Sequence, residues 1–211
     1  ATRAFDFRPG PVFADIVLAD EVNRSPAKTQ SALLEAMQER QMTIDGTTHR
    51  LSEVFTVFAT QNPVEFEGTY PLPEAQVDRF MLKILIGYPG EEHEVLLLDR
   101  VEGGLNPSNL AVSVEPVIDV ATLTELREVV RNVHIEDKVR RYVTSIVRAT
   151  RSLPQVSLGA SPRAAVMLMM AAKARSVLMG REFVTPDDVK SMDVPVLRHR
   201  VLLLPEIEVE G

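Results

Sequence analysis

The chain has 211 residues, 45% of them hydrophobic and 25% charged, which is the balance of a globular protein with a sizeable core. Its formal net charge of -7 argues against non-specific binding to nucleic acid or to an anionic membrane surface. It contains no cysteine, which excludes disulfides, thiolate metal sites and a catalytic thiol, and its longest wholly apolar run, residues 164–172, is too short to cross a bilayer.

The first 88 residues alternate between strand and helix patterns. Residues 14–19, 54–60 and 81–87 are short apolar runs rich in branched side chains, which predicts three buried strands. Ser25 and Pro26 are typical of an N-cap and a first helical position, so we expect a helix over about 26–39. Asp45-Gly46 lies between two extended runs, which predicts a hairpin over about 41–53.

Beyond Tyr88 the pattern becomes helical. We expect helices over about 90–101, 119–132, 135–152, 161–180 and 185 onward, with capping signals at Thr122 and Glu125, at Ser161-Pro162 and at Thr185 to Asp188. The predicted fold is therefore an α/β part, residues 1–88, followed by an all-helical domain, residues 89–211.

The first candidate site is the carboxylate pair Asp20-Glu21, which follows the first predicted strand. Two acids at such a strand end suit a division of labour in which one binds Mg²⁺ and the other deprotonates a water. The alternative is that both acids are hydrated or paired with Arg24, because apolar strands that end in acidic residues are common.

A second candidate, Asn62, follows the next predicted strand, and its neutral amide suits the holding of a water beside a phosphate. Side chains at the carboxyl ends of strands in α/β sheets gather at one edge, so Asn62 and the carboxylate pair reinforce each other. The alternative is that Asn62-Pro63 only initiates a turn.

Two arginines complete the set. Arg79 lies where a predicted short helix runs directly into a strand, a rigid position from which it can stabilise phosphate charge, including that of a neighbouring subunit. Arg163 lies in the first turn of a helix, where a cation opposes the helix dipole and a bound anion would compensate. The alternatives are a surface Arg79 paired with Asp78 or Glu74, and a solvated Arg163.

Three long blocks, residues 16–40, 57–80 and 159–189, together resemble the MoxR family of AAA+ ATPases over nearly the whole chain. The resemblance implies an AAA+ α/β core with a helical lid, and ATP and Mg²⁺ as cofactors. It implies that Asp20 binds Mg²⁺ in a Walker B motif and that Glu21 activates water. By the same resemblance Asn62 is sensor 1, Arg79 is the arginine finger that reaches the next subunit, and Arg163 is sensor 2.

The resemblance also implies what the whole protein does. It implies a cytoplasmic ring of subunits, a hexamer, that couples ATP hydrolysis to chaperone-like remodelling or maturation of client proteins, including metal-cofactor insertion. A protein with a von Willebrand factor A domain is the implied partner. Two alternatives stay open: a non-catalytic interaction module, and a chelatase-type motor of the same AAA+ branch.

One departure from the family is the absence of a GxxxxGK[ST] motif from the 211 residues. We therefore expect this chain alone to be inactive and the core sheet to lack the strand that carries this loop. Residues 54–60 and 81–87 would then each present an unpaired edge. These two edges would be completed by a strand from another chain, by abnormal pairing with each other, or by residues upstream.

Overall fold

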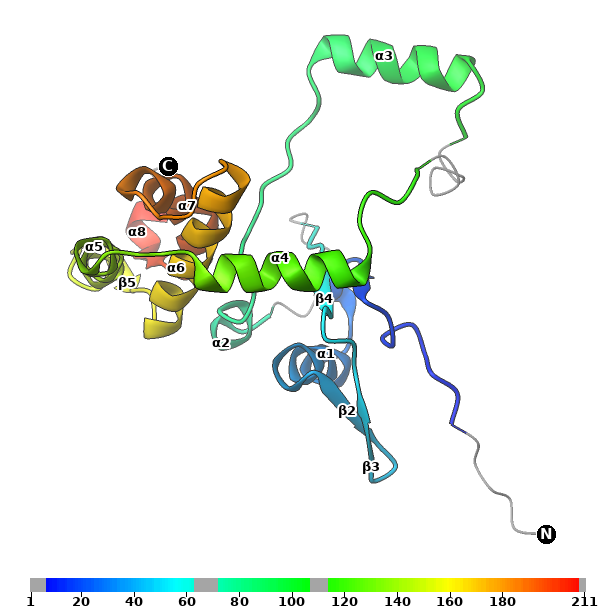
Figure 1. Ribbon diagram of the computed structural model, residues 1–211, viewed down its shortest axis with the longest axis horizontal. Helices are drawn as coiled ribbons and strands as arrows, with labels where there is room; N and C mark the ends of the chain where they lie inside the picture. The colour runs from blue at the N-terminus through cyan, green and yellow to red at the C-terminus, as the bar shows by residue number, and fades with distance from the viewer. Residues whose placement is uncertain (1–6, 63–71, 107–113, 209–211) are drawn as a thin grey trace.

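The computed structural model describes residues 7–62, 72–106 and 114–208, and it contains an α/β part and a helical part (Figure 1). In the α/β part, strands β1 (Ile16–Ala19) and β4 (Thr56–Ala59) pair in parallel, with Val17 opposite Val57. The order of the predicted elements is therefore largely confirmed. The domain boundary near residue 89 stays a prediction.

One face of this two-stranded sheet is covered and the other is exposed. Val17 and Val57 pack against a small core of Ala36, Leu51 and Phe55, beside helix α1 (Ala27–Glu39). On the opposite face Ile16, Leu18 and Phe58 are exposed. Side chains alternate between the faces of a strand, so this pattern fixes which face of the sheet meets α1.

The turn after β1 is held by α1. Helix α1 begins at Ala27, one residue later than predicted, and Pro26 flanks it without a side-chain cap. The buried amide of Gln30 donates to the carbonyl oxygens of Val22 and Ser25, at 3.1 Å each. These bonds fix the short helical turn η1 (Val22–Arg24), which immediately follows the carboxylate pair.

The predicted hairpin is confirmed. Strands β2 (Gln41–Ile44) and β3 (Thr47–Arg50) pair in an antiparallel ladder. Asp45 and Gly46 both have positive φ, 48° and 78°, as a two-residue turn with the twist of its flanking strands requires.

The predicted strand over residues 81–87 is wrong. This segment has no strand pairing, and Ile84, Leu85 and Ile86 are exposed. An apolar run forms a strand only beside a partner, and in the described residues β4 is bonded to β1 alone. The unpaired edge of β4 agrees with the edge expected from the sequence. The segment 81–87 instead follows the short helix α2 (Glu74–Val77), and the Lys83 amide donates to the Pro195 carbonyl.

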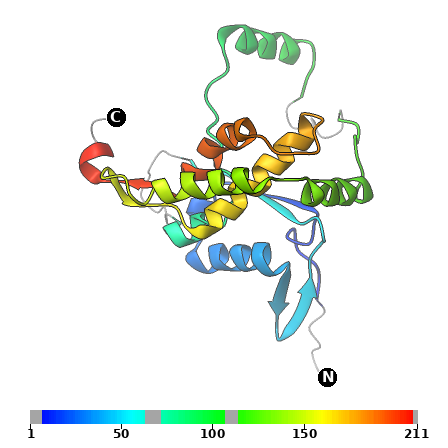
Figure 2. The ribbon, with the colours of Figure 1, turned by 60° about the vertical axis from the view of Figure 1, so that its left-hand side comes forward.

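The helical part contains α3 (Glu91–Glu102), α4 (Val120–Asn132), α5 (Asp137–Ala149), α6 (Pro162–Leu178), α7 (Pro186–Leu197) and α8 (Pro205–Glu208). Helix α3 stands away from the other elements (Figure 2). The main core joins α5, α6 and α7 through Val143, Val147, Leu168, Ala172 and Val196. A small antiparallel ribbon, β5 (Val156–Leu158) with β6 (Leu202–Leu203), was not predicted.

The helix caps are largely those predicted. Ser161 and Pro162 begin α6, and Thr185 with Asp188 forms a capping box on α7. Helix α4 differs, because Asp119 rather than Thr122 is its N-cap and accepts from the Thr122 amide at 2.8 Å. No helix in the described part of the chain is long and apolar enough to span a membrane.

Candidate functional site

The carboxyl ends of β1 and β4 lie side by side, and Thr60 joins them. The Thr60 hydroxyl donates to Asp20 Oδ1 at 2.5 Å and accepts from the Glu21 amide at 2.9 Å. The ladder continues past both strands, because the Val22 amide donates to the Thr60 carbonyl at 3.0 Å. The two acids are therefore fixed to the end of the neighbouring strand.

Glu21 has an unusual backbone conformation and two polar partners. Its φ of 47° lies in the left-handed region, which is uncommon for a residue other than glycine and recurs at functional sites. Its Oε1 accepts from Asn62 Nδ2 at 3.4 Å, and its Oε2 pairs with Arg24 Nε at 3.2 Å. Asn23 Nδ2 in turn donates to the Asn62 carbonyl at 3.4 Å.

The structure thus brings Asp20, Glu21 and Asn62 together at one edge of the sheet, as predicted. The alternative pairing with Arg24 holds for Glu21, whereas Asp20 accepts from the Thr60 hydroxyl. Asp20 is exposed, and a single exposed carboxylate fits Mg²⁺, which binds through one or two carboxylates and keeps waters and phosphate oxygens as its other ligands. No cluster of three or more metal-ligating side chains occurs in the described residues, so a cage made by the protein alone is absent there.

Arg79 follows α2, and it does not pair with Asp78 or Glu74, which was the alternative prediction. Its side chain makes no hydrogen bond or ion pair within the described residues, and its buried Nε has no partner there. Its neighbour Asp78 is engaged by other groups. In the part of the chain that the structure describes, Arg79 is therefore held by its backbone, and its guanidinium has no polar partner there.

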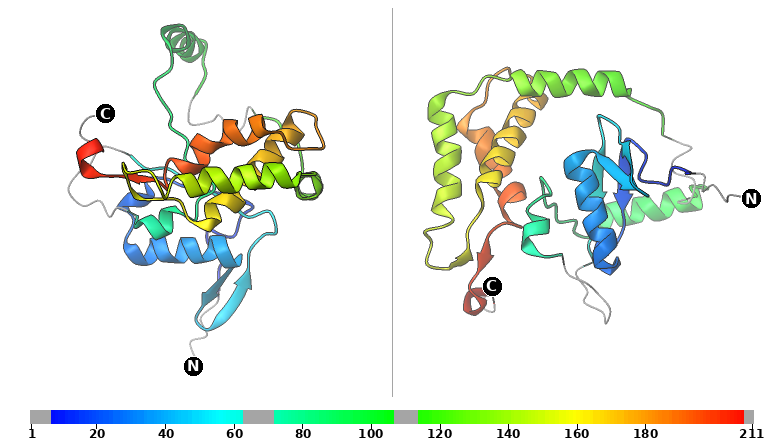
Figure 3. Two further views of the ribbon diagram at one scale, coloured as in Figure 1. Left: turned by 90° about the vertical axis from the view of Figure 1, so that its left-hand side faces the viewer. Right: turned by 90° about the horizontal axis from the view of Figure 1, so that it is seen from below.

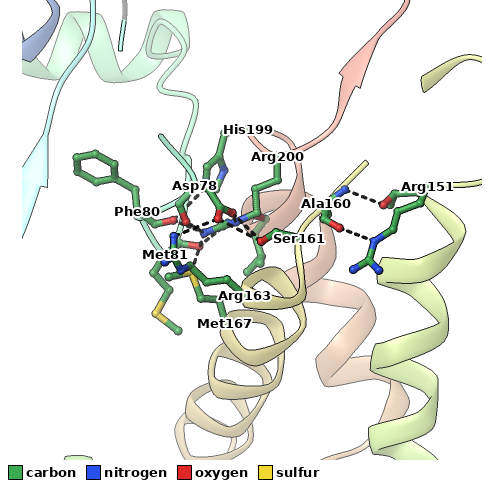
Figure 4. Close-up of polar contacts among 12 residues, drawn as sticks. Asp78, Phe80, Met81, Arg151, Ala160, Ser161, Arg163, Met167, His199 and Arg200 are labelled. Atoms are coloured by element: carbon green, nitrogen blue, oxygen red, sulfur yellow. Dashed lines mark hydrogen bonds and ion pairs between the residues drawn. The ribbon is translucent and has the colours of Figure 1, made fainter. Parts of the chain in front are cut away.

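Helix α2 lies beside the helical part (Figure 3), and Asp78, at its carboxyl end, is the centre of a polar cluster (Figure 4). The Ser161 hydroxyl donates to it at 3.1 Å, and Arg163 Nη1 pairs with Oδ2 at 3.2 Å. Arg200 Nε donates to Oδ1 at 2.9 Å. In this structure the anion beside Arg163 is the Asp78 carboxylate. Neither Arg79 nor Arg163 bonds to Asp20 or Glu21 within the described residues.

Arg200 and His199 also hold the backbone on both sides of Arg79. The Arg200 side chain is 1% exposed, and it donates to the carbonyls of Asp78 at 2.9 Å and Phe80 at 2.5 Å. His199 Nε2 donates to the Phe80 carbonyl at 3.0 Å. Because a carbonyl only accepts, this bond fixes the neutral tautomer with its proton on Nε2.

Comparison with known proteins shows which family the chain resembles. Residues 1–82 match the family described as "ATPase family associated with various cellular activities (AAA)", and residues 148–211 match the AAA lid domain. Chaperone MoxR1 of Mycobacterium tuberculosis is 43% identical over 94% of this chain and 54% of its own length. Protein MoxR of Paracoccus denitrificans is 29% identical over 95% of this chain and 65% of its own length.

The chain belongs to the MoxR family of AAA+ ATPases.

A crystal structure of a protein from Cytophaga hutchinsonii superposes on this MoxR-family chain with a TM-score of 0.89 and 44% identity. It covers 97% of this chain and 63% of the other. The uncharacterised protein YeaC of Bacillus subtilis is 48% identical over 100% of this chain and 64% of its own length. The predicted fold class, an α/β AAA+ core with a helical lid, is therefore confirmed. The chain spans roughly half to two-thirds of the length of these relatives.

Sequence reasoning missed three residues of this MoxR-family site. The signal for Thr60 is a hydroxyl at the end of the predicted strand, two residues before Asn62. The sequence pattern offers Asp78 only as a partner of Arg79, and it offers no role for Arg200. The contacts of Asp78 with Ser161 and Arg200 span 83 and 122 residues of sequence, and no local pattern predicts them.

Proposed function

We propose that the protein containing this chain hydrolyses Mg·ATP and couples hydrolysis to the remodelling of client proteins. The observation that carries the proposal is the arrangement of Asp20, Glu21 and Asn62 at the ends of two adjacent parallel strands. In α/β sheets ligands bind beyond the carboxyl ends of strands, and this pair of acids with a neutral amide suits phosphoryl transfer to water.

Each residue has a separate role in this proposal. When bound, ATP would supply the phosphoryl group that water attacks, and Mg²⁺ would neutralise negative charge on the phosphate oxygens. Asp20 holds the metal, directly or through a water. Glu21 accepts a proton from the attacking water, and Asn62, already bonded to Glu21 Oε1, orients that water without adding negative charge.

The two arginines serve neighbouring sites. Arg79, whose side chain has no polar partner in the described residues, reaches the nucleotide of the next subunit in a ring, which we propose is a hexamer. Arg163, 44% exposed and held by one ion pair, reaches the nucleotide of its own subunit. A guanidinium matches phosphate oxygens in charge and shape.

The client is a protein, and the work is chaperone-like. A relative named chaperone MoxR1 supports this proposal. We extend it to maturation of clients, including metal-cofactor insertion, in the cytoplasm and with a von Willebrand factor A domain partner. The net charge of -7 disfavours nucleic acid as the client.

A non-catalytic interaction module is the second candidate for the isolated chain, because its 211 residues contain no GxxxxGK[ST] loop to cradle phosphates. Isothermal titration of the isolated chain with Mg·ATP tests this second candidate. Absence of binding favours the interaction module for the isolated chain, whereas micromolar binding opposes it.

The test of ATP hydrolysis is Glu21→Gln in the protein translated from the complete gene. This change keeps the shape of the side chain but removes the base, so we expect the Kd for ATP to stay within about threefold while turnover falls about 100-fold or more. Steady-state phosphate release and nucleotide binding measure the two quantities.

The matched control is Glu39→Gln at the exposed end of α1, which should leave turnover unchanged. Wild-type turnover in Glu21→Gln would remove Glu21 from the mechanism.

A further inference from the structure

The helical lid, rather than the sheet, holds the segment that carries Arg79. Arg200 donates to the carbonyl oxygens of Asp78, Phe80 and Met81, and the Lys83 amide donates to the Pro195 carbonyl. Arg79 lies within this clamped segment, and its own amide bonds to the carbonyl of Gln76 in α2. A displacement of the lid must therefore displace Arg79 with it.

The two arginines that share the Asp78 carboxylate are held very differently. The Arg200 side chain is 1% exposed and makes several bonds to this segment, so it is a permanent part of the fold. Arg163 is 44% exposed, and within the described residues its side chain makes one ion pair, to Asp78 at 3.2 Å. An exposed ion pair of this kind is worth little, and a stronger anion displaces it readily.

Asp78 occupies the place where an anion would meet the start of α6. Its carboxylate accepts from the hydroxyl of the N-cap residue Ser161 and faces Arg163 in the first turn. A phosphate bound to Arg163 needs the same guanidinium donors, so the two anions compete for it.

We propose that Asp78 is a positioning residue that couples the lid to Arg79, with Arg200 as its permanent partner and Arg163 as its exchangeable one. When Arg163 binds a nucleotide phosphate instead, it releases Asp78. The Asp78–Arg79–Phe80 segment then loses one of its bonds to the lid, and the position of the Arg79 side chain relative to the neighbouring site changes. This inference rests on the proposed function, because only there do both arginines meet phosphates.

The first test is ATP affinity in the complete protein carrying Asp78→Asn. Loss of the competing carboxylate frees Arg163, so we expect ATP to bind more tightly, by up to about fivefold, the weight of one exposed ion pair. Asp99→Asn, on the exposed helix α3, is the control and should not change the affinity. A general loss of structure weakens binding, so an unchanged or weaker affinity would overturn the exchange.

The second test is turnover in mixed rings. We expect Asp78→Asn alone to lower turnover about tenfold or more, because Arg79 is misplaced. Mixing these subunits with Glu21→Gln subunits, which retain an intact Asp78 and Arg79, should raise turnover per Asp78→Asn subunit, as it should for Arg79→Ala. A residue that only supports its own fold would show no such gain.

The outcomes separate the two proposals. If Arg79→Ala is raised by mixing and Asp78→Asn is not, the coupling role of Asp78 is wrong and the ATPase proposal stands. If neither is raised, the role of Arg79 at the neighbouring site fails, and the coupling fails with it. Should Asp78→Asn not fold, Asp78→Glu keeps the charge beside Arg200 but shifts the carboxylate, and the same gain on mixing is expected at smaller size.

Discussion

Thr60 shows how one side chain sets the geometry of the candidate site. Its hydroxyl accepts from the Glu21 amide and donates to Asp20, so a single residue of β4 fixes both acids at the end of β1. Glu21 adopts a left-handed backbone there, which costs of order 1 kcal/mol or more and persists because its amide and carboxylate are both bonded. The strain is therefore local to the residue that we assign as the base.

His199 makes stability depend on pH. Burial lowers its pKa from 6.5 to about 4, partly offset by the Phe80 carbonyl, and nearby Arg200 and Lys83 lower it further. The unfolded chain therefore binds more protons than the folded chain between these two values. Stability rises with pH across that window and is lost as the pH falls through it.

The pH prediction is tested with His199→Gln, which keeps an N–H donor for Phe80 but does not titrate. Urea unfolding at about pH 7 and about pH 5 should show a smaller loss of free energy on acidification in this variant than in the wild type. His93→Gln on the exposed helix α3 is the control and should behave as the wild type. If all three proteins lose the same unfolding free energy on acidification, His199 is not the cause of the pH dependence.

At the scale of elements, the cap of α7 is a buried ionic cluster. The Asp188 side chain is 2% exposed, and its carboxylate accepts two bonds from Arg181, at 2.6 and 2.8 Å. The Thr185 amide and hydroxyl each donate to it at 2.8 Å. The Arg181 guanidinium and these bonds hold the pKa of Asp188 well below its usual range.

Asp188→Asn should lower the free energy of unfolding by about 2 kcal/mol, because the buried carboxylate loses its charge and some of its charge-assisted bonds to Arg181 and Thr185. Asp187→Asn changes the adjacent, exposed acid in the same turn and should change stability by less than about 1 kcal/mol. Urea denaturation of both variants measures the difference. Equal losses of unfolding free energy in the two variants would show that the Asp188 carboxylate adds no more stability than the exposed Asp187.

Local signals predicted most elements, and the failures have a common physical origin. The alternation of Val17 and Leu18 and the Asp45-Gly46 turn act within a few residues, so the sequence alone was informative. Residues 81–87 carry a strand pattern, but a strand needs a partner, which the described residues do not provide. Likewise, strand ends predicted Asp20 and Asn62 as neighbours, whereas no pattern predicted that Asp78 meets Arg200.

At the scale of the whole molecule, two sets of side-chain hydrogen bonds in the described residues tie the helical part to the α/β part. One is the Asp78 cluster (Figure 4). The other is Arg127 of α4, which donates to the carbonyls of Glu53 and Val54 at 3.1 Å and to the Thr56 hydroxyl at 3.0 Å. Both ties lie close to strand or helix ends that lead to site residues, so lid position and site geometry are linked.

The central claim is that each active site combines Glu21 of one subunit with Arg79 of the next. Arg79→Ala and Glu21→Gln should each abolish most turnover in the complete protein. Rings formed from equal amounts of both variants should recover about one quarter of wild-type turnover, because half of the subunits keep Glu21 and half of those face an intact Arg79. Failure to recover activity at every mixing ratio, in rings shown to contain both variants, would contradict the claim.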